Sequence, residues 1–227
     1  MKYKWLNNAK NKKVIIFFNG WGMDENVVKH LDCEDYDVLM FYNYNTLDTD
    51  FDFESLNIYH EKNLIAWSMG VIVSSLVQPL TRHFVTPSPA RGEGITIAIN
   101  GTLKPIDVEF GIHPKIYDLT IKGFNERGRE KFINSMFDIQ PPPLPSTLER
   151  EIEEQRSELI ALKEICKSTP TLTISLEEGK MLYNKVLISD NDKIIPTKSQ
   201  IAFWGIEPNL KSGHCPFFDF TKWSELL

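Results

Sequence analysis

Two short apolar runs constrain the fold of this chain more than any other feature. The first, from Lys13 to Phe18, reads Lys-Val-Ile-Ile-Phe-Phe, and the second spans Asn63 to Trp67. Continuous runs of β-branched and aromatic residues are typical of strands buried on both faces of a parallel sheet. Further strands are predicted at Asp37 to Tyr42, Ile95 to Ile99 and Tyr183 to Ile188. Because helical stretches separate these strands, the pattern indicates an α/β fold with a mostly parallel central sheet flanked by helices.

The helices between these strands are predicted from apolar periodicity. A buried helix should directly follow the second run, from Met69 to Val77, and another should span Phe124 to Phe137. A proline-rich break follows, and Ser146 is in a suitable position to cap the next helix. We therefore expect a single domain over residues 1–227, with a small helical cap inserted at about residues 122–168.

Charge and cysteine content exclude several classes of function. The formal net charge is −6, which disfavours nucleic acid as a partner because phosphate recognition requires a basic face. No apolar run approaches the roughly 18 residues that cross a membrane, and the first residues do not resemble a signal peptide. The three cysteines are widely spaced, without metal-ligand spacing. We expect a soluble, cytoplasmic monomer that uses no metal and no organic cofactor.

The segment Ala66-Trp67-Ser68-Met69-Gly70 joins the second run to the helix after it. It matches the small-x-Ser-x-small pattern of a nucleophile elbow, in which a strained turn projects the serine hydroxyl above the sheet. The flanking positions must be small because the strand and helix backbones approach closely there. Ala66 stands where glycine is more common. The alternative is that Ser68 lies in an ordinary loop and caps the helix with its side chain.

A serine nucleophile needs a neighbouring base, and His214 stands where that base is expected. In α/β hydrolases the chain order is serine, then an acidic residue, then histidine. His214 follows the last predicted strand, whereas His113 precedes a proline in a segment expected to be irregular. Asp192 and Asp190 both lie in the loop after that strand. We prefer Asp192 as the acid that fixes the imidazole tautomer, and Asp190 remains the alternative.

The oxyanion that forms when an ester carbonyl is attacked needs backbone N–H donors. One is expected from Met69, the residue after the serine. The second is expected from Trp21 in the Gly20-Trp21-Gly22 loop, which ends the first apolar run. The alternative is that this loop only terminates a strand. It is too short for a phosphate-binding loop and lacks the lysine, so nucleotide binding is not expected.

These segments, taken in order, resemble the BioG-type pimeloyl-ACP methyl ester esterases of the α/β-hydrolase superfamily. The resemblance runs from about Phe17 to the C-terminus. It is carried by Phe18-Asn19-Gly20-Trp21-Gly22, Ala66-Trp67-Ser68-Met69-Gly70-Val71, Asn100-Gly101-Thr102, Phe110-Gly111-Ile112, Ser189-Asp190-Asn191-Asp192-Lys193-Ile194-Ile195-Pro196 and Phe220-Thr221-Lys222-Trp223-Ser224. Asn19 departs from the family pattern, because many relatives have histidine at that position.

The resemblance implies an activity as well as a fold. It implies hydrolysis of the methyl ester of pimeloyl-acyl carrier protein, a step of biotin precursor synthesis, with release of methanol. It implies a catalytic triad of Ser68, Asp192 and His214. It also implies that the N–H groups of Trp21 and Met69 bind the oxyanion.

An acidic carrier protein is expected to dock on basic residues of the proposed cap. The candidates are Arg127, Arg129, Lys131, Arg150 and Arg156. Glutamates are interspersed on the same helices, so ordinary solvated helix faces are the alternative. Two other functions stay open at this point: a generic carboxylesterase or thioesterase of the same fold, and a non-catalytic binding protein that keeps the scaffold.

Overall fold

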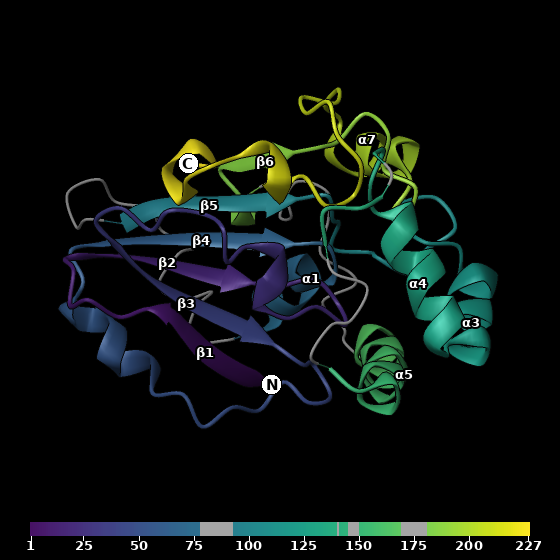
Figure 1. Ribbon diagram of the computed structural model, residues 1–227, viewed down its shortest axis with the longest axis horizontal. Coiled ribbons are helices and arrows are strands. Elements are labelled where there is room, and N and C mark those ends of the chain that lie inside the picture. The colour runs from purple at the N-terminus through teal and green to yellow at the C-terminus, as the bar shows by residue number, and fades with distance from the viewer. Residues whose placement is uncertain (78–92, 140, 145–149, 169–180) are drawn as a thin grey trace.

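The computed structural model describes residues 1–77, 93–139, 141–144, 150–168 and 181–227. Its centre is a six-stranded sheet with the strand order β1-β3-β2-β4-β5-β6 (Figure 1). Strands β3, β2, β4, β5 and β6 pair in parallel, and β1 pairs with β3 in the antiparallel direction. The strands are β1 (Lys2–Asn7), β2 (Lys13–Phe18), β3 (Tyr36–Tyr42), β4 (Glu61–Trp67), β5 (Glu93–Ile99) and β6 (Lys185–Leu187).

The predicted α/β class and mostly parallel sheet are confirmed, and one strand is additional. Strand β1 was not predicted because its sequence, Lys-Tyr-Lys-Trp-Leu-Asn, alternates lysine with aromatic residues. It lies at the edge of the sheet, where its first three residues are exposed. A strand in that position needs no continuous apolar run, since it buries little of its surface.

The two faces of the sheet bury separate apolar layers, as the alternation along β2 shows. Val14, Ile16 and Phe18 pack in one layer, and Ile15 and Phe17 pack in the other. Helix α1 (Met69–Leu76) belongs to the first layer. The second layer is closed by the short 3₁₀ helix η1 (Glu25–Val27) and by the C-terminal 3₁₀ helices η5 (Phe217–Asp219) and η6 (Trp223–Glu225).

The remaining helices include the segment expected to form a cap. Helices α3, α4 and α5 lie beyond the arrowheads of the central strands, at their carboxyl ends (Figure 1). They join β5 to β6 in sequence. Their bounds are α3 (Pro114–Gly123), α4 (Glu126–Ser135) and α5 (Ile152–Ser168), and the chain also forms η2 (Phe53–Ile58) and α7 (Thr197–Trp204).

Helix α3 corrects one expectation about this segment. The region around His113 was expected to be irregular, but His113 is the N-cap of α3 and its Nδ1 accepts a hydrogen bond from the backbone N–H of Lys115 at 3.2 Å. Pro114 occupies the first turn, where its fixed φ and missing N–H are tolerated. Ser146, the predicted N-cap of the following helix, lies outside the described residues. The cap boundaries at about 122–168 remain a prediction.

Register brings the functional loops to one edge of the sheet. Phe18, Ala66 and Ala98 stand side by side in β2, β4 and β5. The loops that follow these parallel strands therefore leave the sheet at the same level, which is where open α/β sheets bind ligands. Within the described parts of the chain, no helix is long and apolar enough to cross a membrane.

Candidate active site

Ser68 occupies a strained turn between β4 and α1. Its backbone has φ 58° and ψ −124°, in a region that non-glycine residues rarely adopt. A Cβ atom added to Gly70 would lie 2.4 Å from the carbonyl oxygen of Phe18 at the end of β2, so the start of α1 packs too closely against the neighbouring strand for a larger residue. The Ser68 side chain makes no capping hydrogen bond. The hydroxyl is therefore not used to cap the helix, and the capping alternative does not describe this site.

The structure brings Ser68, His214 and Asp192 together in one hydrogen-bonded chain. The Oγ atom of Ser68 lies 2.9 Å from Nε2 of His214, and Nδ1 of His214 lies 2.7 Å from Oδ2 of Asp192. All three side chains are buried. Asp190, the alternative acid, is exposed, and so is His113 on α3.

The carboxylate of Asp192 is held in one orientation by groups from its own loop and from α7. Oδ1 accepts hydrogen bonds from the backbone N–H groups of Ile194 at 2.8 Å and Ile195 at 3.0 Å. Oδ2 accepts one from Nε2 of Gln200 at 2.8 Å. With Oδ2 directed at Nδ1 of His214, the favoured tautomer carries its proton on Nδ1 and leaves Nε2 free to accept from Ser68.

Two buried side chains fix the backbone of His214. The indole N–H of Trp67 donates to the His214 carbonyl oxygen at 2.8 Å, and the side-chain amide of Asn100 donates to the same oxygen at 2.9 Å. Asn100 also donates to Oγ of Ser189 and accepts from its backbone N–H, both at 2.8 Å. Asn100 therefore joins the loop that carries His214 to the loop that carries Asp192. Sequence reasoning missed this residue, although asparagine tolerates the positive φ of 46° found there.

Among the described residues, one backbone N–H of the Gly-Trp-Gly loop after β2 has no hydrogen-bond acceptor. The N–H of Asn19 donates to the carbonyl of Phe41, that of Gly20 to Oδ1 of Asn19, and that of Gly22 to Oε2 of Glu158. No described residue accepts a hydrogen bond from the N–H of Trp21, and the same holds for Met69.

Both residues contribute to the pocket around Ser68. Trp21 and Met69 line the same pocket as Ser68 and His214. Asn19, the position that departs from the family pattern, satisfies the Gly20 N–H with its own side chain and so takes part in shaping this loop. Among the described residues, the N–H groups of Trp21 and Met69 thus have no acceptor, and their residues line the pocket that contains Ser68.

The pocket in front of Ser68 has a volume of about 110 Å³ and mostly apolar walls. Helices α3, α4 and α5 supply Ile116, Phe132 and Leu159 to its lining. Lys193, from the loop that carries Asp192, is the cationic side chain among its lining residues. This composition suits a ligand with an apolar chain that reaches the serine.

The predicted docking residues differ in their exposure. Arg127 and Lys131 are exposed on α4, and Arg129 is half-buried and donates from Nη1 to the carbonyl of Arg150 at 3.0 Å. Arg156 has a partly exposed side chain, 3.9 Å from the carboxylate of Glu153.

The structure contradicts the prediction that Arg150 is a docking residue. Its side chain is buried and pairs with Glu158 through Nη1 at 2.7 Å and with Glu154 through Nε at 3.3 Å. A guanidinium that is buried in this way is not accessible to a partner protein. In the described residues, no group of three or more His, Cys, Asp or Glu side chains is arranged to hold a metal ion.

Comparison with known proteins gives one family and several related structures. A family model described as pimeloyl-ACP methyl esterase BioG matches residues 1–226. The crystal structure of BioG from Haemophilus influenzae has a TM-score of 0.81 and 28% sequence identity, covering 100% of this chain and 99% of that one. A bacterial membrane phospholipase A has a TM-score of 0.61 at 17% identity, over 98% of this chain and 78% of its own, which shows the α/β-hydrolase fold.

A sequence relative is longer than this chain. A malonyl-acyl-carrier-protein O-methyltransferase of Bacteroides fragilis is 33% identical over 203 residues, which cover 85% of this chain and 36% of the relative. The chain thus matches about a third of the length of that protein.

Proposed function

This chain belongs to the BioG family of pimeloyl-ACP methyl esterases, and we propose that it hydrolyses the methyl ester of a pimeloyl chain carried by acyl carrier protein. The observation that carries the proposal is the hydrogen-bonded chain of Ser68, His214 and Asp192, whose Ser68 and His214 line a mostly apolar pocket. In this proposal Ser68 is the nucleophile, His214 the general base and Asp192 the residue that orients the imidazole.

The first half of the reaction forms an acyl-enzyme. Oγ of Ser68 bonds to the ester carbonyl carbon while its proton moves to Nε2 of His214. The negative charge on the carbonyl oxygen is stabilised by the N–H groups of Trp21 and Met69. When the tetrahedral intermediate collapses, the bond to the methoxy oxygen breaks and methanol leaves with the proton from His214.

The second half repeats these steps with water. A water molecule gives a proton to Nε2 of His214 and bonds to the acyl carbon. The bond to Ser68 then breaks, and the serine oxygen recovers its proton from His214. The products are methanol and the carrier-bound pimeloyl acid, which ionises to a carboxylate and a proton in water, so atoms and charges balance without a metal or an organic cofactor.

We propose that helices α3, α4 and α5 act as a cap that forms the acyl pocket and the carrier-binding face. The apolar side chains that these helices supply to the pocket suit the methylene chain of the substrate. Arg127, Arg129, Lys131 and Arg156 remain as candidates for docking an acidic carrier. Arg150 is withdrawn from this set because it is buried against Glu158.

The test measures methanol release from pimeloyl-carrier methyl ester by the purified protein. We expect release with the wild-type protein and none with Ser68→Ala. Ser75→Ala is the matched control, because Ser75 lies on α1 and its hydroxyl donates to the carbonyl of Ile72 rather than to the site. Methanol release by Ser68→Ala would overturn the mechanism. Equal rates on the carrier-bound ester and on a short aryl ester would count against the substrate and favour a generic carboxylesterase.

A further inference from the structure

The loop that carries Trp21 is hydrogen-bonded to the amino-terminal half of α5. The indole N–H of Trp21 donates to the carbonyl of Gln155 at 2.8 Å, and Nε2 of Gln155 donates to the carbonyl of Gly22 at 2.6 Å. Oε2 of Glu158 accepts the N–H of Gly22 at 3.2 Å. All of these hydrogen bonds are buried, so water does not replace them readily.

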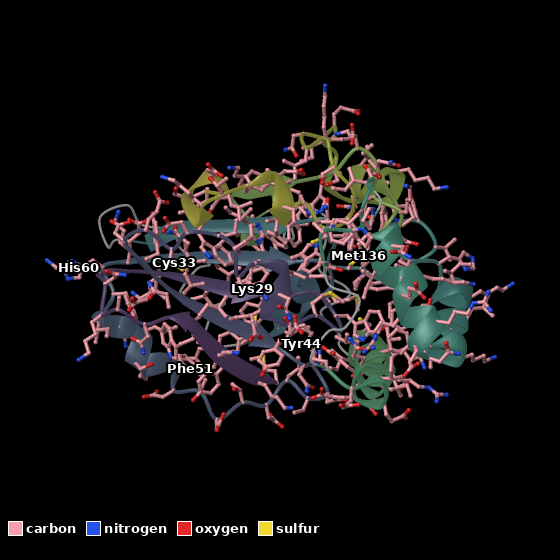
Figure 2. The ribbon with its side chains drawn as sticks, viewed as in Figure 1. Lys29, Cys33, Tyr44, Phe51, His60 and Met136 are labelled. Carbon is pink, nitrogen blue, oxygen red and sulfur yellow. The ribbon has the colours of Figure 1, made fainter. Side chains whose placement is uncertain are left out.

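Glu158 also joins this loop to the end of β3. Its Oε1 accepts the backbone N–H of Tyr44 at 2.8 Å, and its Oε2 accepts from Arg150 at 2.7 Å. Tyr44 in turn donates from its hydroxyl to the carbonyl of Asn19 at 2.7 Å, and it lies between the sheet and α5 (Figure 2). Burial raises the pKa of the Glu158 carboxyl, against the opposing effect of Arg150. One carboxylate thus connects α5, the residue after Trp21 and the residues after β3.

We propose that Gln155 and Glu158 are positioning residues that aim the Trp21 N–H at the reacting carbonyl oxygen. The inference rests on the proposed function, because it takes Trp21 as an oxyanion donor. Neither residue is proposed to touch the substrate. They hold the two peptide units on either side of the Gly22 Cα, since Gln155 donates to the Gly22 carbonyl and Glu158 accepts from the Gly22 N–H.

The geometry predicts a specific kinetic signature. The oxyanion exists in the transition state and not in the bound ester, so a misdirected donor lowers kcat and leaves KM nearly unchanged. Loss of a whole oxyanion donor costs about 10²–10³-fold in kcat. A donor that is still present but less well aimed should cost less, about 10- to 100-fold.

Gln155→Met is the most direct variant. It removes the amide that holds Gly22 and keeps a side chain of similar length. The Gln155 Oε1 atom has no hydrogen-bond donor among the described residues, so the substitution also removes a buried, unpaired carbonyl oxygen. The change also leaves the buried Gly22 carbonyl without its donor, so the free energy of unfolding should fall, but a role in stability alone predicts no loss of kcat in the folded protein. The matched control is Lys163→Met, which removes the ion pair between α5 and Asp118 of α3.

The experiment compares wild type, Gln155→Met and Lys163→Met on a short aryl ester and on pimeloyl-carrier methyl ester. We expect Gln155→Met to lower kcat about 10- to 100-fold on both substrates, with KM within about twofold. The affinity for an alkyl boronic acid, whose serine adduct mimics the tetrahedral intermediate, should fall by a similar factor. Lys163→Met should match wild type in kcat and in boronic acid affinity. An unchanged kcat and boronic acid affinity in folded Gln155→Met would overturn the positioning role.

A second variant covers the case in which Gln155→Met does not fold. Trp21→Phe keeps the ring contacts with Phe124 and Phe132 but removes the indole N–H that binds the Gln155 carbonyl. We expect the same loss of kcat and of boronic acid affinity, and normal values would overturn the proposal. Ser68→Ala distinguishes failure of the proposed function from failure of the positioning role. If Ser68→Ala is active, the proposed function fails. If it is inactive while Gln155→Met behaves as wild type, only the positioning role fails.

Discussion

The side-chain amide of Gln200 donates to Oδ2 of Asp192 at 2.8 Å, the same oxygen that lies 2.7 Å from Nδ1 of His214. The same amide also donates to the carbonyl of Ile195 at 2.8 Å. Because α7 carries Gln200, the orientation of the Asp192 carboxylate depends on a helix that contains none of Ser68, Asp192 and His214. The carboxylate is therefore oriented by a rigid element and not only by its own loop.

Replacement of Gln200 should lower turnover without removing the triad. In Gln200→Met the Asp192 carboxylate loses one of its four hydrogen-bond partners and can rotate away from His214. We expect kcat to fall about tenfold, since orientation and general-base effects each contribute that order of magnitude or more. The measurement is kcat on a short aryl ester, with Lys198→Met on the exposed side of α7 as the control. Equal kcat values in the two variants would contradict this role.

Loss of Asn100 should reduce both stability and activity. Asn100→Ala leaves the N–H of Ser189 without its side-chain acceptor and removes one of the two donors to the His214 carbonyl. An unsatisfied buried polar group costs about 1–3 kcal/mol, so the free energy of unfolding in urea should fall by about that amount. The kcat value should fall in the same variant because the base and acid loops are no longer joined. Stability equal to that of wild type would rule out this account.

Charge reversal on α4 tests the remaining docking residues. Arg127→Glu combined with Lys131→Glu should raise KM for the carrier-bound ester about tenfold, because like charges at the edge of an interface slow encounter. The kcat and KM values for a short aryl ester should not change. Lys12→Glu is the control, since Lys12 is exposed at the amino end of β2, away from the cap helices. Unchanged KM for the carrier-bound ester would show that the carrier docks elsewhere.

Arg150 should behave as a core residue and not as a docking residue. Arg150→Met leaves the carboxylate of Glu158 buried without its cation, a change that typically costs about 3–5 kcal/mol. Arg127→Met, on the exposed face of α4, should change the free energy of unfolding by at most about 0.5 kcal/mol. Urea denaturation measures both values. If the two variants were equally stable, the buried pair would not have the structural role that we assign to it.

Alkaline pH should destabilise the folded chain through its buried thiols. Burial raises the pKa of Cys166 to about 12, and it also raises the pKa of Cys215. A group with a raised pKa in the folded state stabilises fully below its unfolded pKa, and this contribution is lost as the pH rises towards the folded value. For Cys166 the window runs from about pH 8.5 to about pH 12.

The slope of stability against pH measures this effect. Each proton released only on unfolding adds a slope of about 1.4 kcal/mol per pH unit. The free energy of unfolding should therefore fall above about pH 8.5, and it should fall less steeply in Cys166→Val. Identical slopes for wild type and Cys166→Val would show that this thiol titrates normally.

Local patterns in the sequence were enough to predict the turn at Ser68 and the strands that lead to it. Ser68 and Gly70 stand in a five-residue motif whose steric requirement is local, and β2 and β4 are continuous apolar runs. Asp192 and His214 follow from chain order along a known type of fold. Helix α3 was missed because Pro114 suggested a break, although proline is well tolerated in the first turn of a helix.

The supporting residues could not be predicted, because their roles depend on contacts between distant segments. Asn100 lies next to His214 only once the sheet has formed, and their positions differ by 114 residues. Gln155 and Arg150 lie in a stretch of alternating charges, where the sequence does not distinguish a buried face from a solvated one. Arg150 was therefore assigned to the surface, although the only signal of its burial is its pairing with Glu158 in three dimensions.

The contact between Gln155 and Gly22 also bears on when the chain becomes competent during its synthesis. The two residues are 133 positions apart, so a growing chain exposes the Trp21 loop long before α5 exists to hold it. Contacts of this separation close large loops and are slow to form. We therefore expect an emerging chain to present an assembled Ser68 turn but an unsupported Trp21 loop. Because Asp192 and His214 also lie in the second half, a nascent polypeptide would on the proposed mechanism remain inactive until that half has left the ribosome.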